Sequence, residues 1–180
     1  MSALHIAAER GPLVRKLILI SPAAPLELGD FLPAMAGRPV FEAARAGDWS
    51  LRLFSAAQAS MVALAPSFVI NTMFRASPDA DRALLSSKRF VDVVVSSLRA
   101  CLGSQQDAYR SELRAYVQPW AHVLDKVECE IEIWAGSDDD WAPIGMAEAL
   151  KHRLGNRATL NVCPGLGHYS TLQDALSRLD

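Results

Sequence analysis

The sequence predicts an α/β fold in which a mostly parallel sheet is flanked by helices and interrupted by a long helical insertion. Short, continuously apolar runs near both ends of the chain are typical of buried strands, and helical patterns alternate with them. The middle of the chain shows helical patterns without a convincing strand. We therefore expect three parts: a helix and strand over residues 1–25, a helical insertion over 26–118, and further strands and helices over 119–180.

The first part begins with a helix over residues 2–10, where Leu4, Ala7 and Ala8 share one face. Gly11 and Pro12 end this helix. The next run, residues 16–20, is short and almost entirely apolar, which favours a strand buried on both faces of a parallel sheet.

The insertion contains amphipathic helical patterns over residues 49–64, 78–87, 89–102 and 108–117. Proline and glycine residues lie between these patterns, where helix breakers are expected. Residues 91–95 are β-branched enough for a strand, but their flanks are helical, so we predict a helix there. The larger apolar residues of the insertion are expected to pack against one another, or to line a cleft for an apolar substrate: Phe54, Met61, Phe68, Met73 and Phe74.

The last part returns to α/β alternation. Strands are expected at residues 131–134 and 158–162, with helices at 143–154 and 170–179. Each strand runs into a turn rich in small or acidic residues, at 136–140 and at 164–167. Three strands alone leave an exposed sheet edge, which favours self-association.

Composition excludes several classes of protein. The 180 residues carry a formal charge of −2, with 51% hydrophobic and 21% charged residues, as in ordinary globular proteins. No basic run suggests nucleic acid as a partner, and no apolar run of membrane-spanning length suggests a membrane. Cys101, Cys129 and Cys163 lack metal-ligand or disulfide spacing, and no signal peptide pattern opens the chain, so we expect a cytoplasmic protein with reduced thiols.

The turn after the first C-terminal strand carries three successive carboxylates, Asp138, Asp139 and Asp140. Functional residues of parallel sheets collect beyond the carboxyl ends of strands, which makes these residues candidates for catalysis. Aspartates are also common at turns and helix N-termini, where they accept backbone N–H groups, and Pro143 is typical of a first helical turn. Position alone leaves both interpretations open.

The turn after the last strand presents His168 directly after Gly165 and Gly167. Glycines allow positive φ angles and thus a sharp turn that aims the next side chain over the sheet edge. A histidine there is a candidate general base, although a loop histidine is often structural. The pairing of a carboxylate and an imidazole at the ends of two successive strands favours an acid–histidine pair, in the chain order used by hydrolases built on such sheets.

Several motifs resemble those of the α/β-hydrolase family. WAGSDDDWAP, residues 134–143, is similar to the family's G-x-x-D-x-x-x-P turn, and PGLGHYS, residues 164–170, is similar to its P-G-x-G-H turn. Residues 2–26 resemble the helix and strand that follow the nucleophile, and Pro119-Trp120 resembles the return from a helical cap. The resemblance implies that Asp139 is the triad acid, that His168 is the triad base and that residues 26–118 form the cap.

The sequence departs from the family at the nucleophile. The resemblance implies a G-x-S-x-G elbow just before the first helix, and no such motif occurs in the 180 residues. Ser2 is expected inside a helix, Ser21 is expected to form a structural turn, and Cys101 and Cys163 have no base in a recognisable register. We therefore expect a nucleophile upstream of Met1.

The resemblance implies the C-terminal part of a serine-type hydrolase, esterase-like, that supplies acid and base and is inactive without its nucleophile. Two alternatives stay open: a non-catalytic hydrolase-like binding module, and a parent with an aspartate nucleophile, as in dehalogenases. The implied substrate is a small apolar ester, and no cofactor is implied. The remaining histidines, His5, His122 and His152, form no metal-ligand spacing, so no metal is expected.

Overall fold

The computed structural model describes residues 1–179, and its sheet consists of three parallel strands within that range. The strand order follows the sequence: β1 (Lys16–Ile20), β2 (Glu130–Gly136) and β3 (Ala158–Cys163). Leu17 lies opposite Ile131 in the β1–β2 pair, and Ile131 lies opposite Ala158 in the β2–β3 pair. The carboxyl ends of all three strands therefore lie at the same edge of the sheet.

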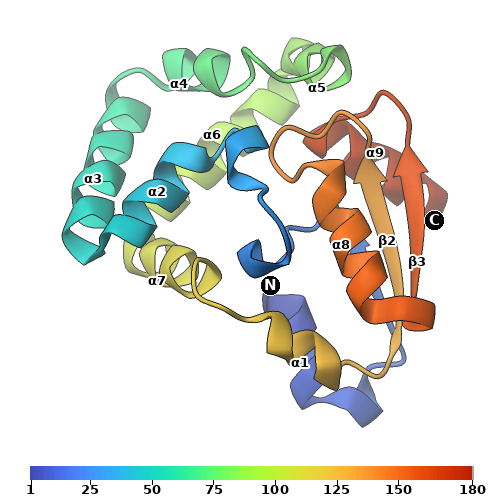
Figure 1. Ribbon diagram of the computed structural model, residues 1–180. Helices are drawn as coiled ribbons and strands as arrows, with labels where there is room; N and C mark the ends of the chain where they lie inside the picture. The colour runs from blue at the N-terminus through green and yellow to red at the C-terminus, as the bar shows by residue number, and fades with distance from the viewer. Residues whose placement is uncertain (180) are drawn as a thin grey trace. The chain divides into compact units, whose positions relative to one another are not determined.

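Two helices cover opposite faces of this sheet, α8 (Ile144–Leu154) and α9 (His168–Leu179) (Figure 1). The buried residues of α8 recur at helical spacing: Met146, Ala147, Leu150 and Leu154. On the opposite face, the Arg178 guanidinium of α9 lies 5.6 Å from the ring centre of Trp134. The predicted alternation of strands and helices is confirmed, and the chain has the predicted α/β class.

The expectation that β1 is buried on both faces is wrong for the described residues. Leu19 is buried, but Ile18 on the other face is 39% exposed. Ile18 pairs with Glu132, and α9 shields the Trp134 end of that face. β1 is also an edge strand, because β2 is its one neighbour among residues 1–179. A continuously apolar strand here is therefore only partly covered.

The first helix, α1 (Ser2–Glu9), matches its prediction closely and buries Leu4 and Ala7. It packs against a 3₁₀ helix, η5 (Ala121–Lys126). The Glu27 carboxylate accepts the backbone N–H groups of Trp120 and Ala121 at 3.0 and 2.8 Å, which satisfies the free donors at the start of η5.

The chain forms two compact units by internal contacts. The first contains Met1–Met35 and the segment from Pro119 onward, and the second contains Ala36–Gln118. Residues 26–35, which the sequence places with the insertion, belong to the first unit by contacts, where Leu26, Leu32 and Met35 are buried.

The second unit is helical throughout its described length, and residues 91–95 lie in a helix as predicted. Its helices are α2 (Arg38–Ala46), α3 (Asp48–Leu64), α4 (Pro66–Met73), α5 (Asp79–Ala83), α6 (Lys88–Leu102) and α7 (Gln106–Tyr116). The sequence patterns did not predict α2 and α4, because Pro39 and Pro66 were interpreted as breakers. Both prolines lie in the first turn of a helix, where the missing N–H has no intrahelical partner to lose.

No single helix in residues 1–179 is long and apolar enough to cross a membrane. Helices α3 and α4 reach that length and hydropathy together, but they meet at a bend of 116°.

Candidate functional site

Two candidate residues come together at the carboxyl edge of the sheet. Asp139 lies three residues after β2, and His168 is the first residue of α9, five residues after β3. His168 Nδ1 lies 2.9 Å from Asp139 Oδ2 and 3.2 Å from Oδ1. Parallel pairing of β2 and β3 produces this contact between residues 29 positions apart, because both turns leave the same edge.

The Asp139 carboxylate is completely buried and fixed by backbone donors. Its Oδ1 accepts the N–H groups of Trp141 and Ala142, each at 2.8 Å. These bonds match the turn-capping interpretation of this aspartate, and the His168 contact matches the catalytic one. The Asp139 side chain therefore caps the turn and contacts the histidine at the same time. A carboxylate held by two backbone N–H groups presents its other oxygen to the imidazole in a defined direction.

The neighbouring carboxylates do not share this arrangement. Asp138 is exposed and accepts the Ser137 hydroxyl at 2.7 Å. Asp139 is the residue of this turn that contacts the His168 ring within the described part of the chain. The geometry therefore distinguishes Asp139 from Asp138 and Asp140, which the sequence alone does not.

The His168 ring is only partly covered. Its side chain is 31% exposed, and rings flank it at centroid distances of 6.5 Å for Trp141 and 5.3 Å for Tyr169. Nδ1 is occupied by Asp139, and no hydrogen-bond partner of Nε2 is found among residues 1–179. Neither aromatic neighbour was predicted from the sequence, although Trp141 lies within the motif at 134–143 and Tyr169 within the motif at 164–170.

The turn that presents His168 differs from expectation at one glycine. Gly165 has a φ of +70°, as predicted, but Gly167 does not adopt a positive φ. Instead the N–H of Gly167 donates to Ser170 Oγ at 2.8 Å, and its carbonyl accepts the Thr171 hydroxyl at 2.5 Å. These bonds start α9 at His168, two residues earlier than predicted.

Gly136 allows the two turns to approach each other. A Cβ atom at this position would lie 2.8 Å from the Gly167 carbonyl oxygen and would clash with the Leu166 carbonyl oxygen. The turns are joined directly as well, since the Asp138 N–H donates to Leu166 O at 3.1 Å and the Gly165 N–H donates to Ser137 Oγ at 2.8 Å. From the sequence, Gly136 was predicted only as the first residue of a turn and as part of the family resemblance; the close approach of the Leu166 and Gly167 carbonyl oxygens explains why a glycine is needed there.

Ser21 supports the same site from the end of β1. It is the one non-glycine residue with a positive φ, 47°, in residues 1–179. Its N–H donates to Trp134 O at 2.7 Å, and its hydroxyl donates to the His168 carbonyl oxygen at 3.2 Å. Ser21 therefore holds the start of α9 through the backbone, consistent with a structural turn.

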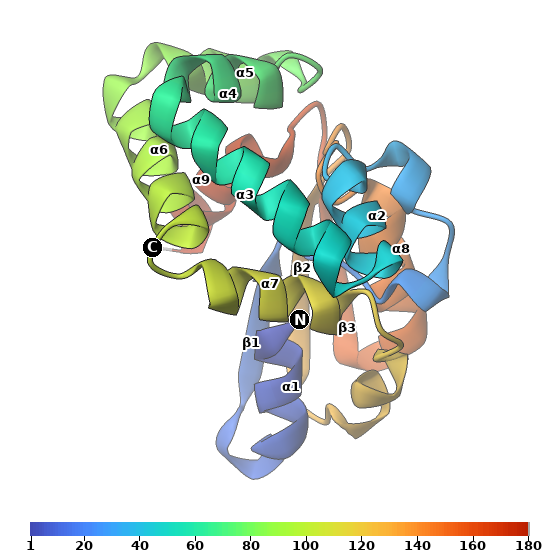
Figure 2. The ribbon, with the colours of Figure 1, turned by 90° about the vertical axis from the view of Figure 1, so that its left-hand side faces the viewer.

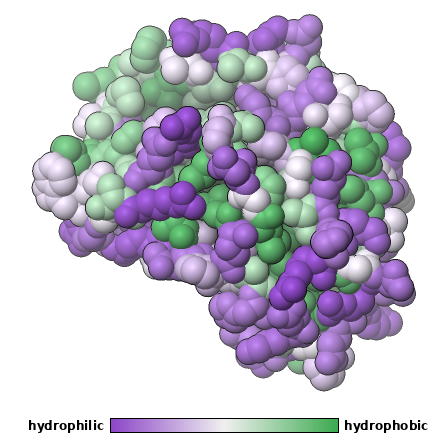
Figure 3. All heavy atoms as spheres, viewed as in Figure 1, coloured by the Kyte–Doolittle hydropathy of each residue, from purple (hydrophilic) through white to green (hydrophobic). Residues whose placement is uncertain are grey.

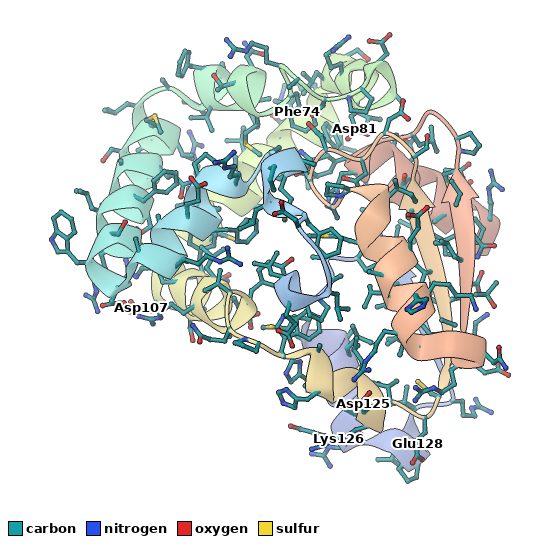
Figure 4. All side chains as sticks on the ribbon, viewed as in Figure 1. Phe74, Asp81, Asp107, Asp125, Lys126 and Glu128 are labelled. Carbon is teal, nitrogen blue, oxygen red and sulfur yellow. The ribbon has the colours of Figure 1, made fainter. Side chains whose placement is uncertain are left out.

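Other candidates lie away from this pair or are chemically unsuited. Ser2 begins α1 as expected. Cys163 is buried, and burial together with the nearby Asp174 carboxylate raises the pKa of its thiol, which disfavours the reactive thiolate. Figure 4 shows Asp125, Lys126 and Glu128 together at the end of the unit where β2 begins, opposite the carboxyl edge. No cluster of three potential metal ligands occurs within the described range.

Comparison with known proteins gives the fold. No family model and no curated protein sequence matches the chain. Among solved structures, MGS-M2, an α/β-hydrolase enzyme from a Medee basin deep-sea metagenome library, aligns with 98% of the chain at a TM-score of 0.62 and 15% identity. The chain has an α/β-hydrolase fold. It covers 57% of the MGS-M2 chain.

Two further structures share the hydrolase fold with this chain. Rv0554 from Mycobacterium tuberculosis aligns with 97% of it at 14% identity and a TM-score of 0.54, with 58% of that protein covered. BpoC from Mycobacterium tuberculosis H37Rv, described as a candidate non-heme bromoperoxidase, gives the same identity and TM-score with 60% covered. The chain thus spans less than two thirds of each of these hydrolase-fold structures.

Proposed function

We propose that this chain supplies the acid and the base of a serine-type hydrolase that acts on esters. The observation that carries the proposal is the contact between the buried Asp139 carboxylate and His168 Nδ1 at 2.9 Å. The geometry matches the acid and histidine of a catalytic triad, in which the acid orients the ring and stabilises its protonated form. We also propose that the helical segment 26–118 serves as the cap.

The pair can perform the proton transfers of ester hydrolysis. With its Nδ1 proton donated to Asp139, a neutral His168 ring has its lone pair on Nε2. Nε2 takes the proton of a serine hydroxyl as that oxygen attacks the ester carbonyl. The ring then gives the proton to the departing alcohol. Water, deprotonated by the same nitrogen, attacks the acyl-serine; the ring returns that proton to the departing serine oxygen, and the carboxylic acid is released.

The nucleophile must come from outside the residues described. No G-x-S-x-G motif occurs in the sequence, and Ser21 contacts the carbonyl of His168. We propose that the serine lies on a strand that pairs with the outer edge of β1, since that edge has no partner strand in residues 1–179. A parallel strand there would end at the same sheet edge as Asp139 and His168.

The test supplies the missing nucleophile. The part of a hydrolase that precedes this region, ending in its strand and G-x-S-x-G turn, is fused ahead of Met1, and hydrolysis of p-nitrophenyl acetate and butyrate is measured. We expect the fusion to hydrolyse these esters and the 180-residue chain to be inactive. His168→Ala and Asp139→Asn should each lower the activity of the fusion by about 10⁴-fold. Asp138→Asn is the matched control and should retain activity.

The outcomes separate the alternatives. A folded fusion, verified by circular dichroism, whose ester hydrolysis is unchanged by His168→Ala would refute the proposed base. Activity that appears with an aspartate at the elbow, on haloalkanes rather than esters, would favour the dehalogenase-like parent. A folded fusion with neither activity would favour the non-catalytic binding module. We place the reaction in the cytoplasm and expect a small apolar substrate.

A further inference from the structure

Ser21 directly follows β1 and has an unusual backbone conformation. Its φ of 47° lies in the left-handed region, which residues with a Cβ atom seldom adopt. Glycine adopts this conformation without the same steric cost. Ser21 is also buried, with 8% of the residue exposed. A buried residue in such a conformation persists only when the surrounding structure holds it there, and such residues are common at functional sites.

Two hydrogen bonds hold Ser21. Its backbone N–H donates to Trp134 O at 2.7 Å, directly after the last paired residues of β1 and β2. Its hydroxyl donates to the His168 carbonyl oxygen at 3.2 Å, between residues 147 positions apart in the sequence. Ser21 therefore joins the carboxyl end of β1 to the backbone of the residue that carries the proposed base.

The two ends of the sheet differ in their surroundings. Figure 2 shows β1 at the border of the sheet, with β2 between it and β3. Around the end of the unit where β2 begins, Figure 3 shows mainly hydrophilic residues. Ser21 and Asp139, at the carboxyl end, are buried. Water competes little for a buried hydroxyl, so the bond from Ser21 to His168 O contributes more than an exposed bond would.

The hydroxyl bonds within the first turn of α9 are local. The Gly167 N–H donates to Ser170 Oγ at 2.8 Å, and the Thr171 hydroxyl donates to Gly167 O at 2.5 Å. These bonds join residues three and four positions apart, so they shape the turn without fixing its distance from β1. The Ser21 hydroxyl fixes that distance, because it reaches His168 O from the end of β1.

The distance from β1 matters for the proposed reaction. The proposed nucleophile lies on a strand paired with the outer edge of β1, so β1 would lie between that strand and β2. A bond from Ser21 to the His168 backbone then sets how far the imidazole lies from the serine. Reacting groups must approach within about 3–3.5 Å, and a misplacement of about 1 Å can cost about 100-fold in rate.

We propose that Ser21 is a positioning residue that holds the His168 base at reaction distance from the nucleophile. This role rests on the proposed function. Ser21 acts through the backbone of His168, and the proton still passes between the nucleophile and Nε2. Loss of the Ser21 hydroxyl should therefore lower kcat and leave KM unchanged, because contacts that bind the substrate are not removed.

Two substitutions of Ser21 in the fusion with the G-x-S-x-G turn separate position from strain. Ser21→Gly removes the hydroxyl and tolerates the positive φ, whereas Ser21→Ala removes the hydroxyl and keeps the steric cost. Both should lower kcat for p-nitrophenyl acetate by about 10- to 100-fold, with KM within about twofold of wild type. Urea unfolding should show Ser21→Gly to be the more stable of the two. Ser177→Ala, which removes an exposed hydroxyl bond elsewhere in α9, is the matched control and should change neither constant.

Nuclear magnetic resonance of the 180-residue chain tests the hydrogen bond without a nucleophile. The carbonyl carbon-13 signal of His168 should shift in Ser21→Gly and Ser21→Ala, because the carbonyl loses its hydroxyl donor. The same signal should stay in place in Ser177→Ala.

The outcomes distinguish the role of Ser21 from the proposed function. An active fusion whose kcat is unchanged by Ser21→Gly, or whose loss lies in KM, would overturn the positioning role and leave the hydrolase proposal standing. An unshifted His168 carbonyl signal in Ser21→Gly would also overturn it. A folded fusion with Ser21 intact that hydrolyses no ester would refute the proposed function and, with it, the role of Ser21.

Discussion

A single carboxylate links the turn after β2 to the start of α9. The buried Asp139 side chain accepts two backbone N–H groups and contacts His168 Nδ1. The backbone bonds fix the direction of the carboxylate, and the carboxylate fixes the ring. The backbone hydrogen bonds that stabilise the turn therefore also orient Asp139 toward His168, as the proposed catalytic role requires. An aspartate in this turn cannot be assigned to one role by position alone.

Asp139→Asn should change the proton position on the imidazole of His168. The carboxylate only accepts hydrogen bonds, so among the two tautomers of the neutral ring it favours the one with its proton on Nδ1. An asparagine can turn its NH₂ group to the ring, which favours the proton on Nε2. Nitrogen-15 NMR chemical shifts of His168 distinguish the two forms. Asp138→Asn should leave them unchanged, and an identical spectrum for Asp139→Asn would contradict the contact.

Glu132 provides a prediction of pH dependence. The Lys16 ammonium, 2.5 Å from its carboxylate, lowers the pKa of Glu132, with further contributions from hydrogen bonds of Trp134 and Asn161. A carboxyl group whose pKa is lower in the folded state stabilises the fold above its unfolded pKa, about 4.3. That stabilisation is lost as the pH falls through the folded-state pKa.

Glu132→Gln should therefore lower the free energy of unfolding at pH 7 by about 0.2–1 kcal/mol, the range measured for solvent-accessible ion pairs. The difference from wild type should disappear at acidic pH, below the folded-state pKa. Urea unfolding at pH 7 and at a pH below the folded-state pKa of Glu132 measures this difference in unfolding free energy. Glu130→Gln, on the same strand and face, is the control and should have no such effect. A Glu132→Gln difference that grows on acidification would have the wrong sign.

At the scale of elements, the strands and their turns were predictable from the sequence. Strand β2 alternates Glu130, Glu132 and Trp134 with the buried Ile131 and Ile133, and its acidic turn follows directly. Helices α2 and α4 were not predictable from the same rules, since a proline in the first turn looks the same in sequence as a proline that ends a helix. The approach of the two turns depends on Gly136, which periodicity does not reveal.

Gly136→Ala adds a single methyl group, but it should destabilise the fold and displace the two turns that carry Asp139 and His168. The added methyl group has no room against the carbonyl oxygens of Leu166 and Gly167 or the Thr171 hydroxyl. We expect a loss of about 1–3 kcal/mol in the free energy of unfolding and weaker contact between His168 and Asp139. Chemical denaturation and the His168 NMR signals measure the two effects.

Gly145→Ala is the matched control on α8. A Cβ atom there would meet the Phe31 ring at 3.8 Å, an ordinary contact. Alanine is also the better helix former, so this variant should be as stable as wild type or slightly more stable. Equal destabilisation by the two substitutions would contradict the packing argument for Gly136.

At the scale of the whole molecule, the chain combines the contact between Asp139 and His168 with a sheet of three parallel strands in residues 1–179. Asp139 and His168 are held by bonds within the first unit, while the outer edge of β1 has no partner strand in residues 1–179. Asp139 and His168 could be predicted from the sequence as neighbours at the carboxyl edge of the sheet, because each follows a predicted strand and each lies in a motif of the resemblance. The partial exposure of β1 was not predictable, because an apolar run does not tell how much of a strand is covered.

The most direct test of the central claim, an acid–base pair that needs a nucleophile from an added strand, is labelling by a fluorophosphonate probe. The 180-residue chain should remain unlabelled. The fusion carrying a strand and G-x-S-x-G turn ahead of Met1 should be labelled at its elbow serine, and His168→Ala should abolish the labelling. Stoichiometric labelling of the 180-residue chain itself, lost on His168→Ala, would contradict the account, because a residue within the chain would then be the nucleophile.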